Sequence, residues 1–290
     1  MKVRANTPIF RWFSRAALVL GLALSANLPA NAQELVDWPR VQSSGVLKVA
    51  VYNYLAPFSH NGEGIHVDIA KALAGKLGLK AQIRPFNEDE EFSDDIRNMV
   101  TRGHYLAGPP ADVLMHAPVD DYIIKKEDQA LFFSPYTRDD IFVARNLKAL
   151  PELSSLDPFS KPGNKIGAET AALASIVLPG ADQAAYSGNL VNFKTPKEAV
   201  DAMLKGELVA VMATRAELEA ALHQKPNASD YYISKVPHNA LPQRGWAVGM
   251  ATKKTNKELA EKLTAAMTEL RESGELTKIF EKYGVRYIRP

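Results

Sequence analysis

The hydrophobic residues of the first half of the chain alternate between strand-like and helix-like spacing. Residues 46–51 form a short apolar run that is typical of a strand in a buried sheet. Ile69, Leu73 and Leu77 then recur every four residues, which predicts a helix that ends at Gly78. The predicted strands are 46–51, 81–86 and 111–115, and the predicted helices are 66–77 and 93–102. This β-α-β-α-β order indicates a parallel sheet with right-handed crossovers.

The alternation restarts after residue 158 and predicts a second α/β unit, divided from the first near residues 137–158. Three segments there carry a helix-start signature, a Thr or Asn followed by Glu: 195–198, 214–217 and 255–258. The predicted strands are 165–167, 190–193, 208–212 and 246–251, and the predicted helices are 170–178, 195–206, the segment from 214 onward, 255–274 and 276–283.

The first 32 residues have the organisation of a secretory signal peptide. Lys2, Arg4, Arg11 and Arg15 form a basic segment, and the apolar run over 16–28 is too short for an ordinary transmembrane helix. The small residues of Ala30-Asn31-Ala32 then form a cleavage site. We expect a signal peptide over 1–32, in preference to an uncleaved anchor, and a mature protein in the bacterial periplasm.

Composition excludes several classes of protein. The chain has 290 residues, of which 46% are hydrophobic and 23% charged, so it is neither disordered nor fibrous. It has no cysteine, which excludes disulfides, thiolate metal sites and a cysteine nucleophile. Removing residues 1–32 takes four of the 35 basic residues and none of the 33 acidic ones, which leaves a net charge of −2. A near-neutral chain gives no electrostatic reason to expect nucleic-acid binding, and no later apolar run is long enough to span a membrane.

Several segments carry a resemblance to a known family. They are 45–51, 54–58, 64–74, 133–136 and the ending over 274–284. In these segments the chain resembles the family 3 extracellular solute-binding proteins, the periplasmic amino-acid receptors of ABC transporters. The resemblance implies an α/β chain with the two-lobed periplasmic-binding-protein fold (type II), in which two parallel-sheet lobes are joined by a two-strand hinge.

The same resemblance implies how the chain is divided. Residues 33–137 plus 246–290 would form lobe 1, and residues 138–245 would form lobe 2. A ligand would bind between the lobes when the hinge closes.

The residues that would bind an amino acid are where this sequence departs from the family. The arginine that the family uses for the α-carboxylate aligns with Glu127, and Lys125 or Lys126 could replace it only as a point charge. The family's aspartate for the amino group aligns with Thr214, which also suits a helix cap. Thr170 is expected to open a helix whose free N–H groups could hold an anion. We therefore predict that the chain keeps the two-lobed fold but has lost the residues with which the family binds an amino acid.

A narrower resemblance lies in 94–99, 103–106 and 111–120, above all in the H-x-P-V-D run over 116–120. These stretches are similar to the MxaJ/XoxJ type of periplasmic protein. That resemblance implies an accessory role in maturing or activating a PQQ-dependent methanol dehydrogenase of the lanthanide or calcium type. The expected partner is the quinoprotein dehydrogenase or its cytochrome.

Aromatic residues after the first strand suggest a cleft without charged anchors. Tyr52, Tyr54 and Phe58 are expected to face it, although each could equally pack the lobe edge. Such a cleft favours an apolar or extended ligand, including a peptide segment of a partner. The candidate cleft residues are Tyr52, Tyr54, Phe58, His116, Ala117, Val119, Asp120, Thr170 and Thr214.

An enzyme or a metal site is the weaker expectation. His116, Asp120 and Asp121 follow a strand end, where acid–base chemistry or a metal could be placed, but a structural role explains them as well. The acidic run 88–91 lacks the spacing of a calcium loop. We therefore expect no catalytic residue, no metal and no cofactor. Three interpretations stay open: the accessory protein, a transport receptor for a non-standard small ligand, and a cleft enzyme of the dehydratase type.

Overall fold

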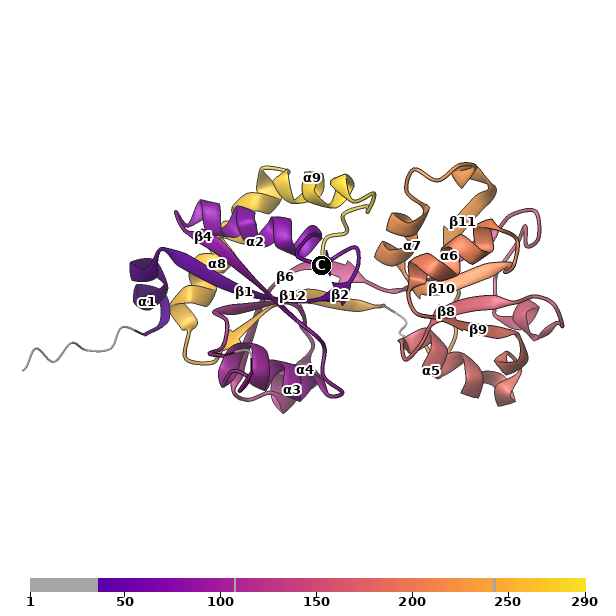
Figure 1. The fold of residues 1–290 in the computed structure, drawn as a ribbon. Helices are drawn as coiled ribbons and strands as arrows, with labels where there is room; N and C mark the ends of the chain where they lie inside the picture. Colours follow the sequence, from indigo (N-terminus) through magenta and orange to yellow (C-terminus); the bar gives the residue numbers. More distant parts are fainter. Residues whose placement is uncertain (1–35, 107, 242–243) are drawn as a thin grey trace, which may run out of the picture. The chain divides into compact units, whose positions relative to one another are not determined.

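The computed structural model describes residues 36–106, 108–241 and 244–290 (Figure 1). The predicted signal peptide and its cleavage site lie outside the described residues. Among the helices of the described ranges, none is long and apolar enough to cross a membrane.

The first lobe is built on a five-stranded sheet of order β4-β1-β5-β12-β6. Its strands are β1 (Val46–Tyr52), β4 (Lys80–Phe86), β5 (Val113–Pro118), β6 (Ala130–Asp139) and β12 (Trp246–Lys253). Strands β4, β1 and β5 run parallel, whereas β12 is antiparallel to both of its neighbours. A two-stranded hairpin of β2 (Tyr54–Leu55) and β3 (Ser59–His60) follows β1.

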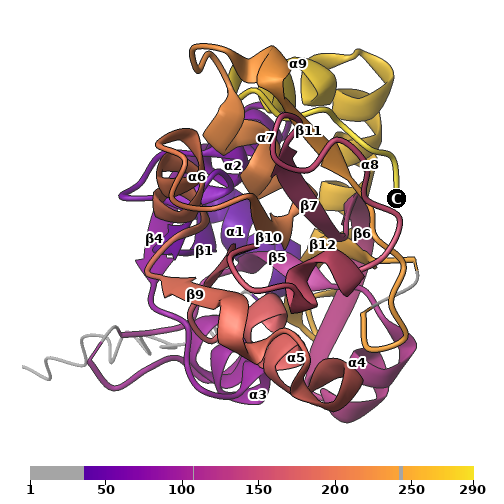
Figure 2. The ribbon, with the colours of Figure 1, turned by 90° about the vertical axis from the view of Figure 1, so that its right-hand side faces the viewer.

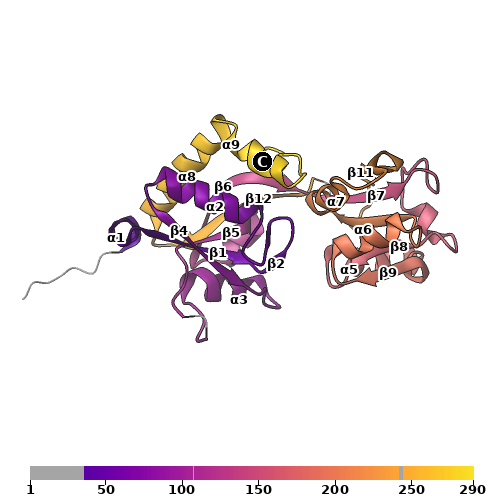
Figure 3. The same ribbon diagram turned by 45° about the horizontal axis from the view of Figure 1, so that its top comes forward.

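Helices cover both faces of this sheet (Figures 1 and 3). They are α1 (Asp37–Ser44), α2 (Ile65–Lys76), α3 (Phe92–Ile96), α4 (Asp121–Lys126), α8 (Lys257–Glu272) and α9 (Glu275–Lys282). Val49 and Val51 of β1 face one core with α2, α8 and α9, while Ala50 and Tyr52 face the other core with α3. Successive side chains of a strand point to opposite faces, so β1 is buried on both sides.

The second lobe repeats this plan with a sheet of order β11-β7-β10-β8-β9 (Figure 2). Its strands are β7 (Ile141–Asn146), β8 (Ile166–Glu169), β9 (Leu190–Phe193), β10 (Ala210–Thr214) and β11 (Tyr231–Ser234), and its helices are α5 (Leu173–Gly180), α6 (Pro196–Leu204) and α7 (Arg215–Leu222). Ala210 and Met212 of β10 join the core under α5, while Val211 and Ala213 join the core under α6 and α7.

The predicted strands and helices are confirmed with end shifts of a few residues, except that the helix predicted over 93–102 is divided into α3 and a π-helix over Arg97–Thr101. The sheets are mixed rather than wholly parallel. The chain leaves the first sheet through β6, enters the second through β7 and returns through β12, so these strands run against their neighbours. The periodicity did not predict β6, β7 or β11. The division at residues 137/138 and 245/246 stays a prediction.

The two connections between the sheets lie side by side. Trp246 at the start of β12 pairs with Asp139 at the end of β6. Gly245 has φ +61°, and a Cβ there would lie 2.1 Å from the Asp139 carbonyl oxygen. Only glycine tolerates both conditions, so this residue allows the two connections to touch.

Helix starts follow the predicted signatures in part. Thr214 and Glu217 form a complete capping box at α7, and Thr195 accepts the Glu198 N–H at α6. The cap of α8 is different, because Asn256 makes no side-chain cap. Instead the Asp37 carboxylate accepts the N–H groups of Glu258 at 2.8 Å and Leu259 at 3.0 Å.

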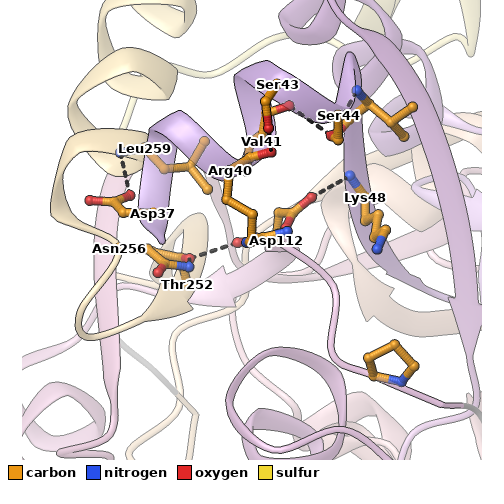
Figure 4. Close-up of polar contacts among 12 residues, drawn as sticks. Asp37, Arg40, Val41, Ser43, Ser44, Lys48, Asp112, Thr252, Asn256 and Leu259 are labelled. Atoms are coloured by element: carbon orange, nitrogen blue, oxygen red, sulfur yellow. Dashed lines mark hydrogen bonds and ion pairs between the residues drawn. The ribbon is translucent and has the colours of Figure 1, made fainter. Parts of the chain in front are cut away.

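Asp37 belongs to α1, which a second contact fixes to the sheet (Figure 4). The buried Asp112 carboxylate pairs with the Arg40 guanidinium and accepts the Lys48 N–H at 2.8 Å. The Asp112 carbonyl oxygen accepts the Thr252 hydroxyl at 2.6 Å. Helix α1 therefore connects β1, β5, β12 and α8.

We expect Asp37→Ala to lower the free energy of unfolding by about 1 kcal/mol, because α8 loses its N-terminal cap. Asp37→Asn keeps one acceptor and should lose less. Urea unfolding of both variants tests this expectation, with Ser43→Ala on the exposed side of α1 as the control. An Asp37→Ala protein as stable as the wild type would contradict the role of this cap.

Candidate functional site

A cavity of about 580 Å³ is lined by residues of both sheets. Many of them lie at the carboxyl ends of parallel strands, where ligands of α/β sheets bind. Tyr52 ends β1, Glu88 follows β4, Glu169 ends β8 and Thr214 ends β10. The lining residues are Tyr52, Tyr54, Leu55, Asn87, Glu88, His116, Ile141, Glu169, Thr170, Ala171, Ala172, Leu173, Ala174, Pro196, Met212, Ala213, Thr214, Glu217 and Trp246.

Five of the nine candidate cleft residues line this cavity, namely Tyr52, Tyr54, His116, Thr170 and Thr214. Thr170 does so without opening a helix, because α5 begins at Leu173. Its N–H and its hydroxyl both donate to the Phe193 carbonyl oxygen. Thr170 therefore offers no helix N-terminus to an anion.

Phe58, Ala117 and Val119 lie elsewhere. Phe58 is 2% exposed and stacks on His66 with ring centroids 4.8 Å apart. Ala117 is fully buried in the core beside α3. The Val119 side chain covers Gly249, where a Cβ would approach Val119 Cγ2 to 2.6 Å. None of the three lines the cavity.

The residues considered for chemistry or metal binding are not assembled. Asp120 caps α4 by accepting the Tyr122 N–H at 2.8 Å, and Asp121 lies in the first turn of that helix. Neither lines the cavity with His116. Within the described part of the chain, no group of three or more His, Asp or Glu side chains could hold a metal ion.

No side chain replaces the missing arginine. Glu127 ends α4 and accepts the Ser93 hydroxyl, and Lys125 and Lys126 lie on α4 outside the cavity. Among the described residues that line the cavity, none is a lysine or an arginine. An α-carboxylate would therefore meet no cationic side chain here.

The charged residues of the lining are all acidic: Glu88, Glu169 and Glu217. Burial, and then the charge of Glu88, raises the pKa of Glu169. Burial raises the pKa of Glu217 to about 8, and the charges of Asp139 and Glu169 add to this shift. The hydrogen bonds from Thr214 act in the opposite direction without cancelling it.

An adjoining cavity of about 370 Å³ continues this acidic surface. It shares Tyr52, Glu88, His116 and Trp246 with the first cavity, among others, and adds Asp89 and Asp95. Burial raises the pKa of Asp95 to about 6. This lining also contains no lysine or arginine among the residues that the structure describes.

The hydroxyl groups of the first cavity are largely used as donors. Tyr52 donates to Asp95 at 2.8 Å, and Thr170 donates to the Phe193 carbonyl at 3.0 Å. Thr214 donates to Glu217 Oε2 at 2.8 Å. The polar lining is therefore dominated by hydrogen-bond acceptors.

His116 lies at a β-bulge, and its ring packs against Phe58 and His66 with centroids 4.8 and 5.0 Å apart. On β12, Gly249 pairs with Ala117 and Met250 pairs with Met115, which leaves His116 unpaired, with φ +63°. Bulges of this kind re-aim side chains beside functional sites. Burial lowers the pKa of His116 to about 4, so its imidazole is neutral at neutral pH.

Sequence reasoning missed Glu169, Glu217 and Trp246 as cavity residues and considered Glu88 only as part of an acidic run without the spacing of a calcium loop. Glu169 lies at a strand end, and the strand-end rule could have found it. Glu217 was explained fully by the capping box, and nothing local shows that its second oxygen faces a cavity.

Comparison with known proteins supports the fold. No family model and no curated protein matches this chain. The solved structure of an ancestral cationic amino acid solute-binding protein is similar, with 19% identity, TM-score 0.66 and coverage of 84% of this chain and 97% of that one. An ancestral arginine-binding protein bound to arginine has 26% identity, TM-score 0.54 and coverage of 82% and 98%.

A Streptococcus pneumoniae amino acid ABC transporter substrate-binding protein bound to L-arginine has 19% identity, TM-score 0.59 and coverage of 84% and 95%. The structural neighbours are thus amino acid substrate-binding proteins. The chain has their two-lobed type II periplasmic-binding-protein fold.

We expect the stability of the protein to fall with rising pH through the titration of Glu217. Its pKa in the folded state, about 8, lies above the ordinary value of 4.5. The folded state therefore binds this proton more tightly, which stabilises it at pH 4.5 and below, and the contribution is lost as pH rises through 8.

Glu217→Gln keeps the cap acceptor and removes the titration. Urea unfolding between pH 5 and 8 should show a smaller decrease in unfolding free energy for this variant than for the wild type. The exposed Glu207→Gln should behave like the wild type. Equal pH dependence for Glu217→Gln and the wild type would refute the assignment.

Proposed function

We propose that this chain is a periplasmic solute-binding component of an ABC transporter that binds a non-standard small ligand in the 580 Å³ cavity. The cavity carries the proposal, because strand ends of two separate sheets contribute to one concave site. Its neighbours in structure are substrate-binding proteins, which supports the same role. Export through a cleaved signal peptide is part of this proposal.

The connections between the sheets are consistent with closure around a ligand. Two adjacent connections, at Asp139–Ile141 and at Gly245–Trp246, join the two sheets, and Ala216 of α7 also packs in the core of the first lobe. Hinges of this kind absorb the backbone rotation of domain closure. Trp246 lies both at this connection and in the cavity wall, so a bound ligand would contact the hinge directly.

A blocked cavity tests this function. Ala172 lines the cavity, and Ala185 is an exposed residue of the same lobe that does not. We expect at least one solute from a panel of amino acids, amines, sugars and organic anions to raise the Tm of the wild type. At 100 times its Kd a ligand stabilises a protein by about 2.7 kcal/mol, which is a shift of several degrees.

The shift should disappear in Ala172→Trp and persist in Ala185→Trp. If every solute leaves the Tm of the wild type unchanged, or if Ala172→Trp responds like Ala185→Trp, solute binding in this cavity is rejected.

A second candidate is an accessory protein of a PQQ-dependent methanol dehydrogenase system. The exposed aromatic and aliphatic side chains of the segment 103–106 favour it, since Tyr105 is 88% and Leu106 is 78% exposed. Exposed apolar side chains in one segment are typical of a docking contact. The partner would be the quinoprotein dehydrogenase or its cytochrome, and no cofactor would be bound by this chain itself.

Size-exclusion chromatography with a purified PQQ-dependent methanol dehydrogenase tests this candidate. A complex should form with the wild type and with Tyr232→Ser, which alters an exposed tyrosine of the second lobe. It should be lost when Tyr105 and Leu106 are both changed to Ser. Separate elution of the wild type and the dehydrogenase would reject the accessory role.

A cleft enzyme of the dehydratase type is the least supported candidate. His116 lines the cavity, but Asp120 caps α4 outside it, so the expected pairing of base and acid is not available. The similar structures reported above are named as binding proteins. We therefore propose a protein without catalytic activity.

A further inference from the structure

We infer that the cavity selects an organic cation that carries a protonated amino or guanidino group and no carboxylate. The inference rests on the proposed function and names the class of solute. It follows from the charge of the lining, from the hydrogen-bonding groups that remain free, and from the aromatic walls.

The carboxyl groups of the cavity have no cationic partner among the described residues of the lining. Glu88, Glu169 and Glu217 line it, and the adjoining cavity adds Asp89 and Asp95. Among the described residues of both linings there is no lysine or arginine. A carboxylate that is removed from water without a cation raises the free energy of the site, and a cationic ligand would offset that cost by pairing with it. A carboxylate on the ligand would add repulsion.

The hydrogen-bonding groups that remain free in the cavity also favour a cationic ligand. Both capping bonds to Glu217 use Oε2, and no hydrogen bond from the described residues reaches its Oε1. His116 presents a neutral ring, and its Nδ1 is buried without a partner among the described residues. The hydroxyls of Tyr52, Thr170 and Thr214 already donate elsewhere. Ammonium and guanidinium groups are donors only, so they match these acceptors.

The hydrogen-bond donors that remain in the lining would bind the glutamates less strongly than a ligand cation would. They are the amide of Asn87, the hydroxyl of Tyr54, the indole N–H of Trp246, the one N–H of the neutral His116 ring, and the first backbone N–H groups of α5 at Leu173 and Ala174. None of them carries a formal charge. A charge-assisted bond from a ligand cation is stronger than any of them.

The apolar walls suit the body of such a ligand. Tyr52, Tyr54 and Trp246 line the cavity together with Leu55 and Met212. Aromatic faces attract cations, and they also pack against methylene groups. A short alkyl chain that ends in a cationic group meets both requirements.

A third cavity, of about 440 Å³, shows that the ligand has room to extend. It shares Tyr54, Glu169 and Glu217 with the first cavity and also contains Lys197 and Lys225. Both lysines are already paired with Asp201, at 2.7 and 2.8 Å. They are therefore not free to hold a ligand carboxylate at the far end of the site.

Two pairs of probes measure the effect of the ligand carboxylate on binding. Agmatine is arginine without its carboxylate, and cadaverine is lysine without its carboxylate. By isothermal titration calorimetry we expect at least one of the two amines to bind, and to bind at least about tenfold more tightly than its amino acid, because like charges are juxtaposed only in the latter.

Glu169→Gln with Glu217→Gln should weaken binding of that amine by at least about tenfold, whereas the exposed Glu207→Gln should not. Arginine or lysine binding as tightly as its amine would overturn the inference and leave solute binding intact. No binding of any of the four probes would also overturn it. The proposed function fails only if the wider solute panel fails as well.

Proton release provides a second readout. A bound cation beside Glu217 should lower the pKa of that carboxyl, so binding at pH 7.5 should release a proton. The calorimetric heat should then depend on the ionisation enthalpy of the buffer for the wild type but not for Glu217→Gln. Heats independent of the buffer in both proteins would contradict contact between the cation and Glu217.

Discussion

The group of acidic side chains in the cavity is the constraint on which this account depends. Burial raises the pKa of Glu169, Glu217 and the nearby Asp139, and the charge of Arg215 acts in the opposite direction at Asp139. The fold places no lysine or arginine in the described lining. It retains Glu217 because the same side chain caps α7 through Oε2. One residue thus stabilises a helix and leaves an acceptor for a ligand.

The rest of the fold fixes these groups in place. Glu169 ends β8, whose first three residues are buried, and Glu217 lies in the first turn of α7 directly after the buried strand β10. Asp112 and Asp37 join α1 to β1, β5, β12 and α8, which stiffens the first lobe (Figure 4). The proposed closure would be taken up by the paired connections at Asp139 and Gly245. A rigid site on a movable connection is the arrangement that ligand-driven closure requires.

The sequence predicted the elements better than it predicted the site. Periodicity located β1 and α2 because their burial is local and regular, and the spacing of Thr214 and Glu217 predicted a real capping box. The cap of α8 could not be predicted, because Asp37 lies more than 200 residues away along the chain. Tertiary contacts likewise decided that Phe58 is buried against His66 rather than exposed in the cavity.

The departures from the family pattern predicted only which ligand group the site would not bind. Glu127 at the expected arginine position predicted that an α-carboxylate meets no arginine, and this stays a prediction. The acidic lining could not be predicted from the sequence, because Glu88, Glu169 and Glu217 come from three separate segments that only the fold brings to one cavity. The bulge at His116 depends on the pairing of β5 with β12 and has no signature in the residues themselves.

The pKa of Glu217 is the most direct test of the central claim. The carboxyl carbon of this residue can be followed by ¹³C NMR from pH 4 to 9 in the ligand-free protein, with Glu217→Gln to assign the signal. An uncompensated, buried carboxyl should titrate near pH 8. Titration near the ordinary value of 4.5 would mean that the cavity carries no uncompensated charge, and the account of a cation site would be wrong.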